Sequence, residues 1–208
     1  MTETRDRRPL TSRSTRWARA LARVLGNSAI TPNQISVFSI GLAAGGAALL
    51  TLWPTPTGFV LAAACVQLRL LCNLLDGMVA IEGGKQSPLG ALYNELPDRI
   101  ADSLFLVALG YAAGFGWLGW LMALLAALTA YIRAVGGSLG LAQDFRGPQS
   151  KPQRMAVMTA TLLAGAIELH VLGTHRVLLW GAGLIALGSA LTCVRRVRGI
   201  AVQLQAGN

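Results

Sequence analysis

Long apolar blocks, separated by short polar stretches, dominate the chain after residue 32. Most of the blocks approach the length of about 20 residues that a helix needs to cross the hydrocarbon core of a bilayer. Turn-forming sequences rich in glycine and proline lie between several of them. The pattern therefore predicts an all-α membrane protein with six transmembrane helices. The predicted spans are 33–53, 58–81, 88–110, 117–140, 155–173 and 177–194.

The segment before the first span has an amphipathic pattern. Its arginines recur at steps of three or four residues, at Arg13, Arg16, Arg19 and Arg23. Apolar residues gather on the opposite side, at Trp17, Leu21, Val24 and Leu25. This spacing predicts a helix lying on an anionic leaflet, although a basic tail with no further role is the alternative. We divide the chain into a basic N-terminal segment (1–30), a six-helix domain (31–198) and a short cytoplasmic tail (199–208).

Composition supports a membrane protein. The chain is 53% hydrophobic and 13% charged, with a mean hydropathy of +0.53. A soluble domain normally has about 25% charged residues. The three cysteines form no CxxC pair, which excludes a disulfide or zinc framework. The basic start lacks a short apolar core with a cleavage site, so we expect no cleavable signal peptide.

The distribution of positive charge predicts the orientation. Of the 18 lysines and arginines, 14 lie in the N-terminal segment, in the loops at 82–87 and 141–154 and after the last span. Only Arg176 lies on the opposite side. Positively charged loops stay in the cytoplasm, so we expect a multi-pass protein of a bacterial-type inner membrane with both termini cytoplasmic. Because topology explains the net charge of +9, nucleic-acid binding is not expected.

Polar residues interrupt the second and third predicted spans at helical spacing. Asn73 and Asp76 are three residues apart, so they share one face of the second span. Asn94, Asp98 and Asp102 follow at steps of four on the third span. Because the connection between these spans is short, we expect the helices to be antiparallel neighbours. Their polar faces would then meet at the cytoplasmic end.

Such a polar cluster has two interpretations. A charge inside lipid costs about 2.5–3.5 kcal/mol, so intramembrane acids face a wet cavity, a cation or a basic partner. Converging carboxylate and amide oxygens are hard ligands that suit Mg²⁺, Mn²⁺ or Ca²⁺. The structural alternative is that Asp98 pairs with Arg99 or Arg69, while the asparagines join the helices. Gly77 and Gly90 would admit a ligand, but they also fit close helix packing.

The two spans together resemble a known two-part motif. CDP-alcohol phosphatidyltransferases carry D-x-x-D-G-x-x-A-R, a short gap, and G-x-x-x-D-x-x-x-D. This chain has Asn73-x-x-Asp76-Gly77-x-x-Ala80-Ile81, then Gly90-x-x-x-Asn94-x-x-x-Asp98, in the same register. The resemblance covers nearly the whole chain, because it extends to Thr31-Pro32-Asn33, Tyr131-x-Arg133 and Lys151-x-x-Arg154.

The resemblance implies a metal-dependent membrane enzyme of phospholipid biosynthesis. It would transfer a phosphatidyl group from CDP-diacylglycerol to an alcohol acceptor, phosphorylated or not, and release CMP. The positions that hold Mg²⁺ or Mn²⁺ are Asn73, Asp76, Asn94 and Asp98, with Asp98 also the catalytic base. The positions that bind the CDP donor are Gly77, Ala80 and Gly90. The resemblance also implies a homodimer.

Three basic residues lie at or near the same cytoplasmic face: Arg133, Lys151 and Arg154. Guanidinium groups match phosphate oxygens, so we expect this set to bind the phosphate of an acceptor such as a polyol phosphate. The alternative is that Lys151 and Arg154 only obey the positive-inside rule.

The chain departs from the motif at three positions. Asn73 and Asn94 replace acids, and Ile81 replaces an arginine. Each asparagine keeps a carbonyl ligand but removes a negative charge, so the set favours one divalent cation or a weakly held pair. Asp102 and Glu82 are candidates to compensate. The functional alternatives are a catalytically inactive relative that binds CDP-lipid and a small membrane transporter.

Overall fold

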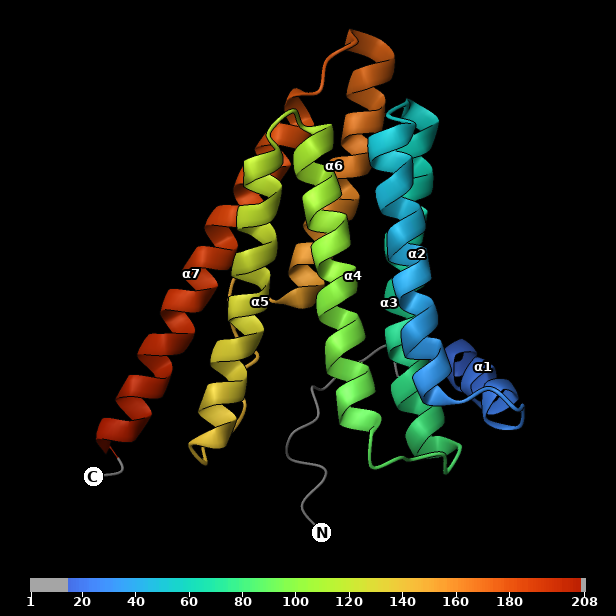
Figure 1. Ribbon diagram of the computed structural model, residues 1–208, viewed down its shortest axis with the longest axis vertical. Helices are drawn as coiled ribbons and strands as arrows, with labels where there is room; N and C mark the ends of the chain where they lie inside the picture. The colour runs from blue at the N-terminus through green and yellow to red at the C-terminus, as the bar shows by residue number, and fades with distance from the viewer. Residues whose placement is uncertain (1–14, 207–208) are drawn as a thin grey trace.

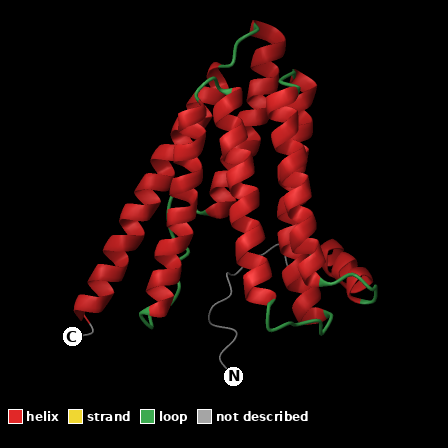
Figure 2. Ribbon diagram, viewed as in Figure 1, coloured by secondary structure: helices red, strands yellow, loops and turns green. Residues whose placement is uncertain are grey.

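The computed structural model describes residues 15–206, which form seven helices and contain no strand (Figures 1 and 2). Five of the helices, α2, α3, α5, α6 and α7, are long and apolar enough to cross a membrane. The prediction of a multi-pass all-α membrane protein is thereby confirmed. The count of six spans stays a prediction, because α4 is 23 residues long but contains four charged residues. The helices are α1 (Arg16–Gly26), α2 (Pro32–Leu52), α3 (Pro56–Glu82), α4 (Gly90–Ala112), α5 (Gly116–Ser138), α6 (Lys151–Leu172) and α7 (Arg176–Ala206).

The six long helices form a closed ring. In order around the ring, α3 packs on α2, α2 on α4, α4 on α5, α5 on α7, α7 on α6, and α6 again on α3. The sequence predicted that α3 and α4 would be direct neighbours, and this is wrong in detail. They are consecutive, but α2 packs against both, while α3 and α4 touch each other at few points. Helices α3 and α4 carry polar side chains on their facing sides. These side chains need space and partners, so the two helices contact each other mainly through side chains and not through close approach of their backbones.

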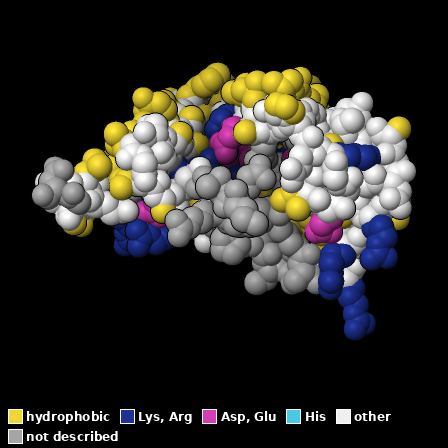
Figure 3. Space-filling view, turned by 90° about the horizontal axis from the view of Figure 1, so that it is seen from below, with side chains coloured by type: hydrophobic (Ala, Val, Ile, Leu, Met, Phe, Trp, Pro, Cys, Tyr) yellow, Lys and Arg dark blue, Asp and Glu magenta, His cyan; other side chains and the backbone are white. Residues whose placement is uncertain are grey.

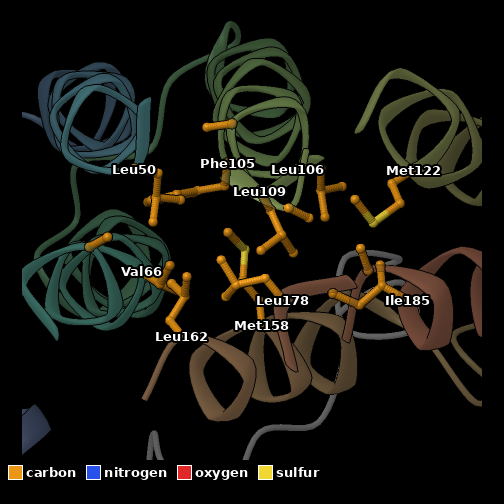
Figure 4. Packing of buried hydrophobic residues seen from close by; sticks show 14 of the residues in the cluster. Leu50, Val66, Phe105, Leu106, Leu109, Met122, Met158, Leu162, Leu178 and Ile185 are labelled. Carbon is orange, nitrogen blue, oxygen red and sulfur yellow. The ribbon is translucent and has the colours of Figure 1, made fainter. Parts of the chain in front are cut away.

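Apolar side chains fill one end of the ring. Seen along the bundle, Leu50, Phe105, Leu109, Met158 and Leu162 point from different helices into one core (Figure 4). All five are fully buried. Burying a side chain of this size contributes about 1.5–3 kcal/mol relative to water, although lipid contact reduces that difference on the outer face. The polar residues of the predicted site lie in the other half of the bundle.

Side-chain caps fix where α2 begins. The Thr31 hydroxyl accepts a hydrogen bond from Gln34 N (3.2 Å), and Gln34 Oε1 accepts one from Thr31 N (2.9 Å). Pro32 follows in the first turn, where its missing N–H costs nothing. This capping box places Ser36 one turn into α2, beside the motif of α3.

Helix α6 begins well above the lower ends of α3, α5 and α7 (Figure 1). The loop at 139–150 therefore rises along the bundle before α6 starts at Lys151. As a result, Lys151 and Arg154, in the first turn of α6, lie inside the ring rather than at its rim.

The amphipathic helix is confirmed over α1, while Arg13 lies outside the described residues. Ala18 and Ala22 are buried against Leu74 and Met78 of α3. Of the large apolar side chains of α1, Trp17 is 54% and Val24 66% exposed, whereas Leu25 packs against the buried cluster. This outward apolar face fits an interfacial helix, and its membrane contact stays a prediction.

Candidate active site

Two cavities lie in the polar half of the ring. The first, which we call the motif cavity, measures about 370 Å³ and is lined by six of the seven predicted metal and donor positions: Asn73, Asp76, Gly77, Ala80, Gly90 and Asn94. The second, the cationic cavity, measures about 430 Å³ and is lined by Asp98, Arg133, Lys151 and Arg154. The two cavities share five lining residues: Asn73, Asn94, Glu95, Arg133 and Phe145. Seen from below, acidic and basic side chains lie together in a recess between the helix ends (Figure 3).

Asp76 is the buried acid of the motif cavity, with 5% of its surface exposed. Its Oδ2 accepts a hydrogen bond from the Ser36 hydroxyl (2.7 Å), and its Oδ1 accepts one from Gly77 N (2.6 Å). No lysine or arginine of the described chain forms an ion pair with it. A Cβ built on Gly90 would meet no atom within 4 Å, so this glycine borders open space.

Asp98 joins three helices at the cationic cavity. Its Oδ1 accepts hydrogen bonds from Asn73 Nδ2 (2.6 Å) and Arg69 (3.1 Å). Its Oδ2 is bound by the Lys151 ammonium and lies 3.5 Å from Arg99. The structural alternative considered for Asp98 is therefore present too: both arginines pair with it, and Asn73 joins α3 to α4.

Asp102 does not compensate for the missing acids. It is 2% exposed, lines neither cavity, and pairs with Arg69 (2.7 Å) and Arg154 (2.8 Å). Two full cationic partners satisfy this carboxylate inside the bundle. Glu82 is exposed at the end of α3 and also lines neither cavity.

Arg133 lies where the two cavities meet. Its guanidinium pairs with Glu95 (2.6 Å), donates to Gln143 Oε1 (3.2 Å), and lies 5.2 Å from the centre of the Phe145 ring. Glu95 follows Asn94 directly, about 100° further round the helix, so it does not share the face of Asn94 and Asp98. The structure adds that Glu95 lines both cavities and is bound to a predicted acceptor residue.

The loop at 139–150 supplies residues that the sequence did not indicate. Gln143 and Phe145 come from it, and both line the motif cavity. The loop is braced by Asp144, which accepts hydrogen bonds from Arg146 N (2.8 Å) and Nε (3.0 Å). Partial burial raises the pKa of Asp144, but the Arg146 bonds outweigh burial and hold that pKa below its usual value. Loops without a periodic pattern carry no signal that would have found these contacts.

Arg196 is the further cationic residue that sequence reasoning missed. It lines the cationic cavity from α7, is 5% exposed, and donates to the carbonyl oxygens of Thr129 (2.6 Å) and Arg146 (3.0 Å). In the sequence it stands in a basic run at 195–198, where the positive-inside rule explains it equally well.

The oxygen donors of the motif fit a hard divalent cation, in reduced number. Asp76 and the two asparagines offer one carboxylate and two amide oxygens around one cavity, and hard oxygens are what Mg²⁺ and Mn²⁺ take. Within residues 15–206, no group of three or more His, Cys, Asp or Glu side chains could hold a metal. The two asparagines explain why no such group forms. They replace acids of the motif, so two acids remain, and two acids attract less positive charge than four.

Known proteins resemble this chain over most of its length. The family model of CDP-alcohol phosphatidyltransferases matches residues 29–194. The chain is 29% identical over 187 residues to a phosphatidylinositol phosphate synthase of Mycobacteroides abscessus, covering 86% of this chain and 81% of the relative. It is 32% identical over 181 residues to an archaetidylinositol phosphate synthase of Aeropyrum pernix, covering 86% and 88%.

Solved structures share the fold. The phosphatidylinositol phosphate synthase of Mycobacterium tuberculosis with CDP-DAG bound has a TM-score of 0.75, at 24% identity, over 89% of this chain and 94% of that one. The same enzyme in complex with manganese and citrate has a TM-score of 0.73, at 23% identity, over 88% of each chain. Since the family model covers most of the sequence, the prediction from the motif is confirmed: the chain belongs to the CDP-alcohol phosphatidyltransferase family.

Proposed function

We propose that this chain transfers the phosphatidyl group of CDP-diacylglycerol to a hydroxyl of a phosphorylated polyol and releases CMP. One observation carries the proposal. The cavity lined by the donor motif and the cavity lined by five basic residues meet at Asn73, Asn94, Glu95, Arg133 and Phe145. An enzyme that joins two phosphate-bearing substrates needs two such pockets with a common border.

The motif cavity suits the nucleotide end of the donor. Gly77, Ala80 and Gly90 line it with small side chains, which leaves room for a diphosphate close to the backbone. The cationic cavity also contacts apolar side chains of α3, including Leu70, Leu71 and Leu74. A lipid-linked substrate requires such a combination of polar head pocket and apolar wall.

The cationic cavity suits an acceptor that carries its own phosphate. Arg133, Lys151, Arg154 and Arg196 all line it. Arginine recognises phosphate through planar pairs of N–H donors, and lysine adds a compact point charge. The relatives named as inositol phosphate-lipid synthases support a polyol phosphate of the inositol phosphate class.

The chemistry needs one bond made and one broken. The acceptor hydroxyl oxygen attacks the phosphorus of the phosphatidyl group, and the bond from that phosphorus to the CMP oxygen breaks. Asp98 lines the acceptor cavity at the border, so it is placed to take the hydroxyl proton. A divalent cation held by Asp76, Asn73 and Asn94 would neutralise the negative charge that spreads over the transferred phosphoryl group.

The membrane setting follows from the same orientation. We propose that all six long helices cross an inner membrane, with both termini and the two cavities on the cytoplasmic side, where a soluble polyol phosphate is available. Charged residues on α4 turn toward the cavities and the ion pairs, which supports a sixth span despite its charge. The homodimer implied by the family resemblance stays a prediction.

The test is CMP release by the purified protein in lipid nanodiscs. We expect release from CDP-diacylglycerol with Mg²⁺ or Mn²⁺ and a polyol phosphate, and much less with the unphosphorylated polyol. Removing the proton acceptor in Asp98→Asn should reduce the rate by about 10²–10⁴-fold. Arg195→Gln, an exposed change outside both cavities, is the control and should keep full activity.

The catalytically inactive alternative makes a different prediction in the same assay. An inactive relative would bind CDP-diacylglycerol but release no CMP with any acceptor. Such a result in wild type would refute the proposed function. Equal rates for phosphorylated and unphosphorylated acceptors would refute only the acceptor class.

A further inference from the structure

We infer that this site takes one divalent cation, at Asp76, and that the Lys151 ammonium supplies the second positive centre for the donor diphosphate. The inference rests on the proposed function, since it describes how that reaction's negative charge is balanced. It also changes the role of Lys151, which the sequence assigned to the acceptor phosphate.

The charge around Asp98 supports a single cation. A continuous set of ion pairs joins three acids to five bases: Asp98, Asp102 and Glu95 to Arg69, Arg99, Arg133, Lys151 and Arg154. Positive charge is therefore already in excess on this side of the site. A metal ion bound to Asp98 would have to displace or approach these cations at short range, where like charges repel strongly.

Asp76 differs from Asp98 in its partners. This carboxylate is buried, and within the described chain it has a hydroxyl and a backbone N–H as partners but no ion pair. A buried acid without a cationic partner is costly in a membrane protein. We assign the proposed metal ion as the positive charge that balances the Asp76 carboxylate.

The amide of Asn73 also favours a single cation. Its Nδ2 donates to Asp98 Oδ1 at 2.6 Å, and its carbonyl oxygen makes no hydrogen bond with the described residues. The amide thus turns a donor toward Asp98 and leaves an oxygen ligand for a cation in the motif cavity. An aspartate at this position would place two carboxylates side by side, and a second cation would be needed between them.

The position of Lys151 supports a contact with the donor diphosphate. Its ammonium binds Asp98 Oδ2, on the opposite side of that carboxylate from Asn73. Asn73 borders both cavities, so Lys151 lies one side chain away from the border where the transferred phosphoryl group must sit. A lysine at that place can contact the diphosphate from the acceptor side while the metal contacts it from the donor side.

The experiment counts bound Mn²⁺ per chain in purified nanodisc-embedded protein with CDP present and no acceptor. We expect one ion in wild type and none above background in Asp76→Asn. We expect Asn73→Asp/Asn94→Asp to bind two ions. Because the double variant could be unstable, Asn94→Asp alone serves as a second measurement. Asn94 is exposed in the cavity, and its change should tighten Mn²⁺ binding by about tenfold.

A titration with CDP in the presence of Mn²⁺ tests Lys151 separately. Lys151→Gln should weaken CDP binding by about tenfold or more, Lys151→Arg should restore most of it, and Arg195→Gln should leave it unchanged. An unchanged affinity in Lys151→Gln would return this lysine to the acceptor phosphate and overturn its assignment here. Two ions in wild type, or none, would overturn the assignment of a single cation.

Neither measurement depends on turnover. A chain that binds one Mn²⁺ with CDP, yet releases no CMP with any acceptor, would refute the transferase function and leave the cation assignment standing. A chain that turns over with two bound ions would do the reverse.

Discussion

Arg133 concentrates three kinds of contact at the border of the two cavities. It pairs with the Glu95 carboxylate, bonds the Gln143 amide, and stacks near Phe145. The Glu95 side chain is partly exposed, with 45% of it accessible. A carboxylate bound to a guanidinium occupies the place that a substrate phosphate would take. At the residue scale, we therefore expect Glu95 to compete with the acceptor phosphate for Arg133.

This competition predicts opposite effects for the two partners. Glu95→Gln should lower the KM for the phosphorylated acceptor by about two- to fivefold. The reason is that the Arg133 guanidinium then binds the acceptor phosphate without first releasing the Glu95 carboxylate. Arg133→Gln should raise that KM by about 10–100-fold, the cost of losing charged hydrogen bonds. Steady-state kinetics with saturating CDP-diacylglycerol measure both.

The control for these variants is Glu82→Gln, which removes an acid outside both cavities. Its KM should match that of wild type. A rise in KM for Glu95→Gln would show that Glu95 helps to bind the acceptor, and the competition argument would then be wrong.

At the scale of elements, Lys85 in the loop between α3 and α4 adds a polar anchor to the apolar packing of α1 on α3. Lys85 Nζ donates to the carbonyl oxygens of Leu25 (3.4 Å), Ser28 (2.5 Å) and Ile30 (3.0 Å). These carbonyls end α1 and lead into α2, where a helix C-terminus attracts positive charge. The lysine thereby fixes the turn between α1 and α2, and α1 in turn places Trp17 on the cationic cavity.

Removing this anchor should loosen α1 without unfolding the bundle. We expect Lys85→Met to cost about 1–2 kcal/mol in the docking of α1, since the charged hydrogen bonds are lost while the carbonyls remain accessible to water. Limited trypsin digestion should then cleave faster after Arg19 and Arg23. Arg198→Met, an exposed change on α7, is the matched control. Equal cleavage rates in both variants would mean that apolar packing alone holds α1.

Helical periodicity predicted the elements well. Caps and turn residues at Thr31-Pro32 and Thr55-Pro56 set the starts of α2 and α3 within a few residues of the expected ones. The start of α6 was harder, because Lys151 and Arg154 look like loop charges and in fact form its first turn. Hydropathy alone cannot place a polar helical turn inside a bundle, since tertiary partners such as Asp98 and Asp102 decide its position.

For the whole molecule, the ring of six helices explains why the site is built from distant parts of the chain. Residues predicted from one two-part motif line one cavity together, because α3 and α4 carry them on facing sides. Arg196, Gln143 and Phe145 reach the same region from α7 and from a loop. No local pattern encodes those long-range contacts, so sequence reasoning could identify the donor half of the site better than the acceptor half.

The most direct test of the central claim is the mass of the lipid product. The protein is incubated with CDP-diacylglycerol, Mn²⁺ and an inositol phosphate, and lipids and CMP are quantified together. The account predicts a new phospholipid that contains two phosphorus atoms, formed in equal amount to CMP. CMP released without such a lipid, or with a product that contains only one phosphorus atom, would contradict it.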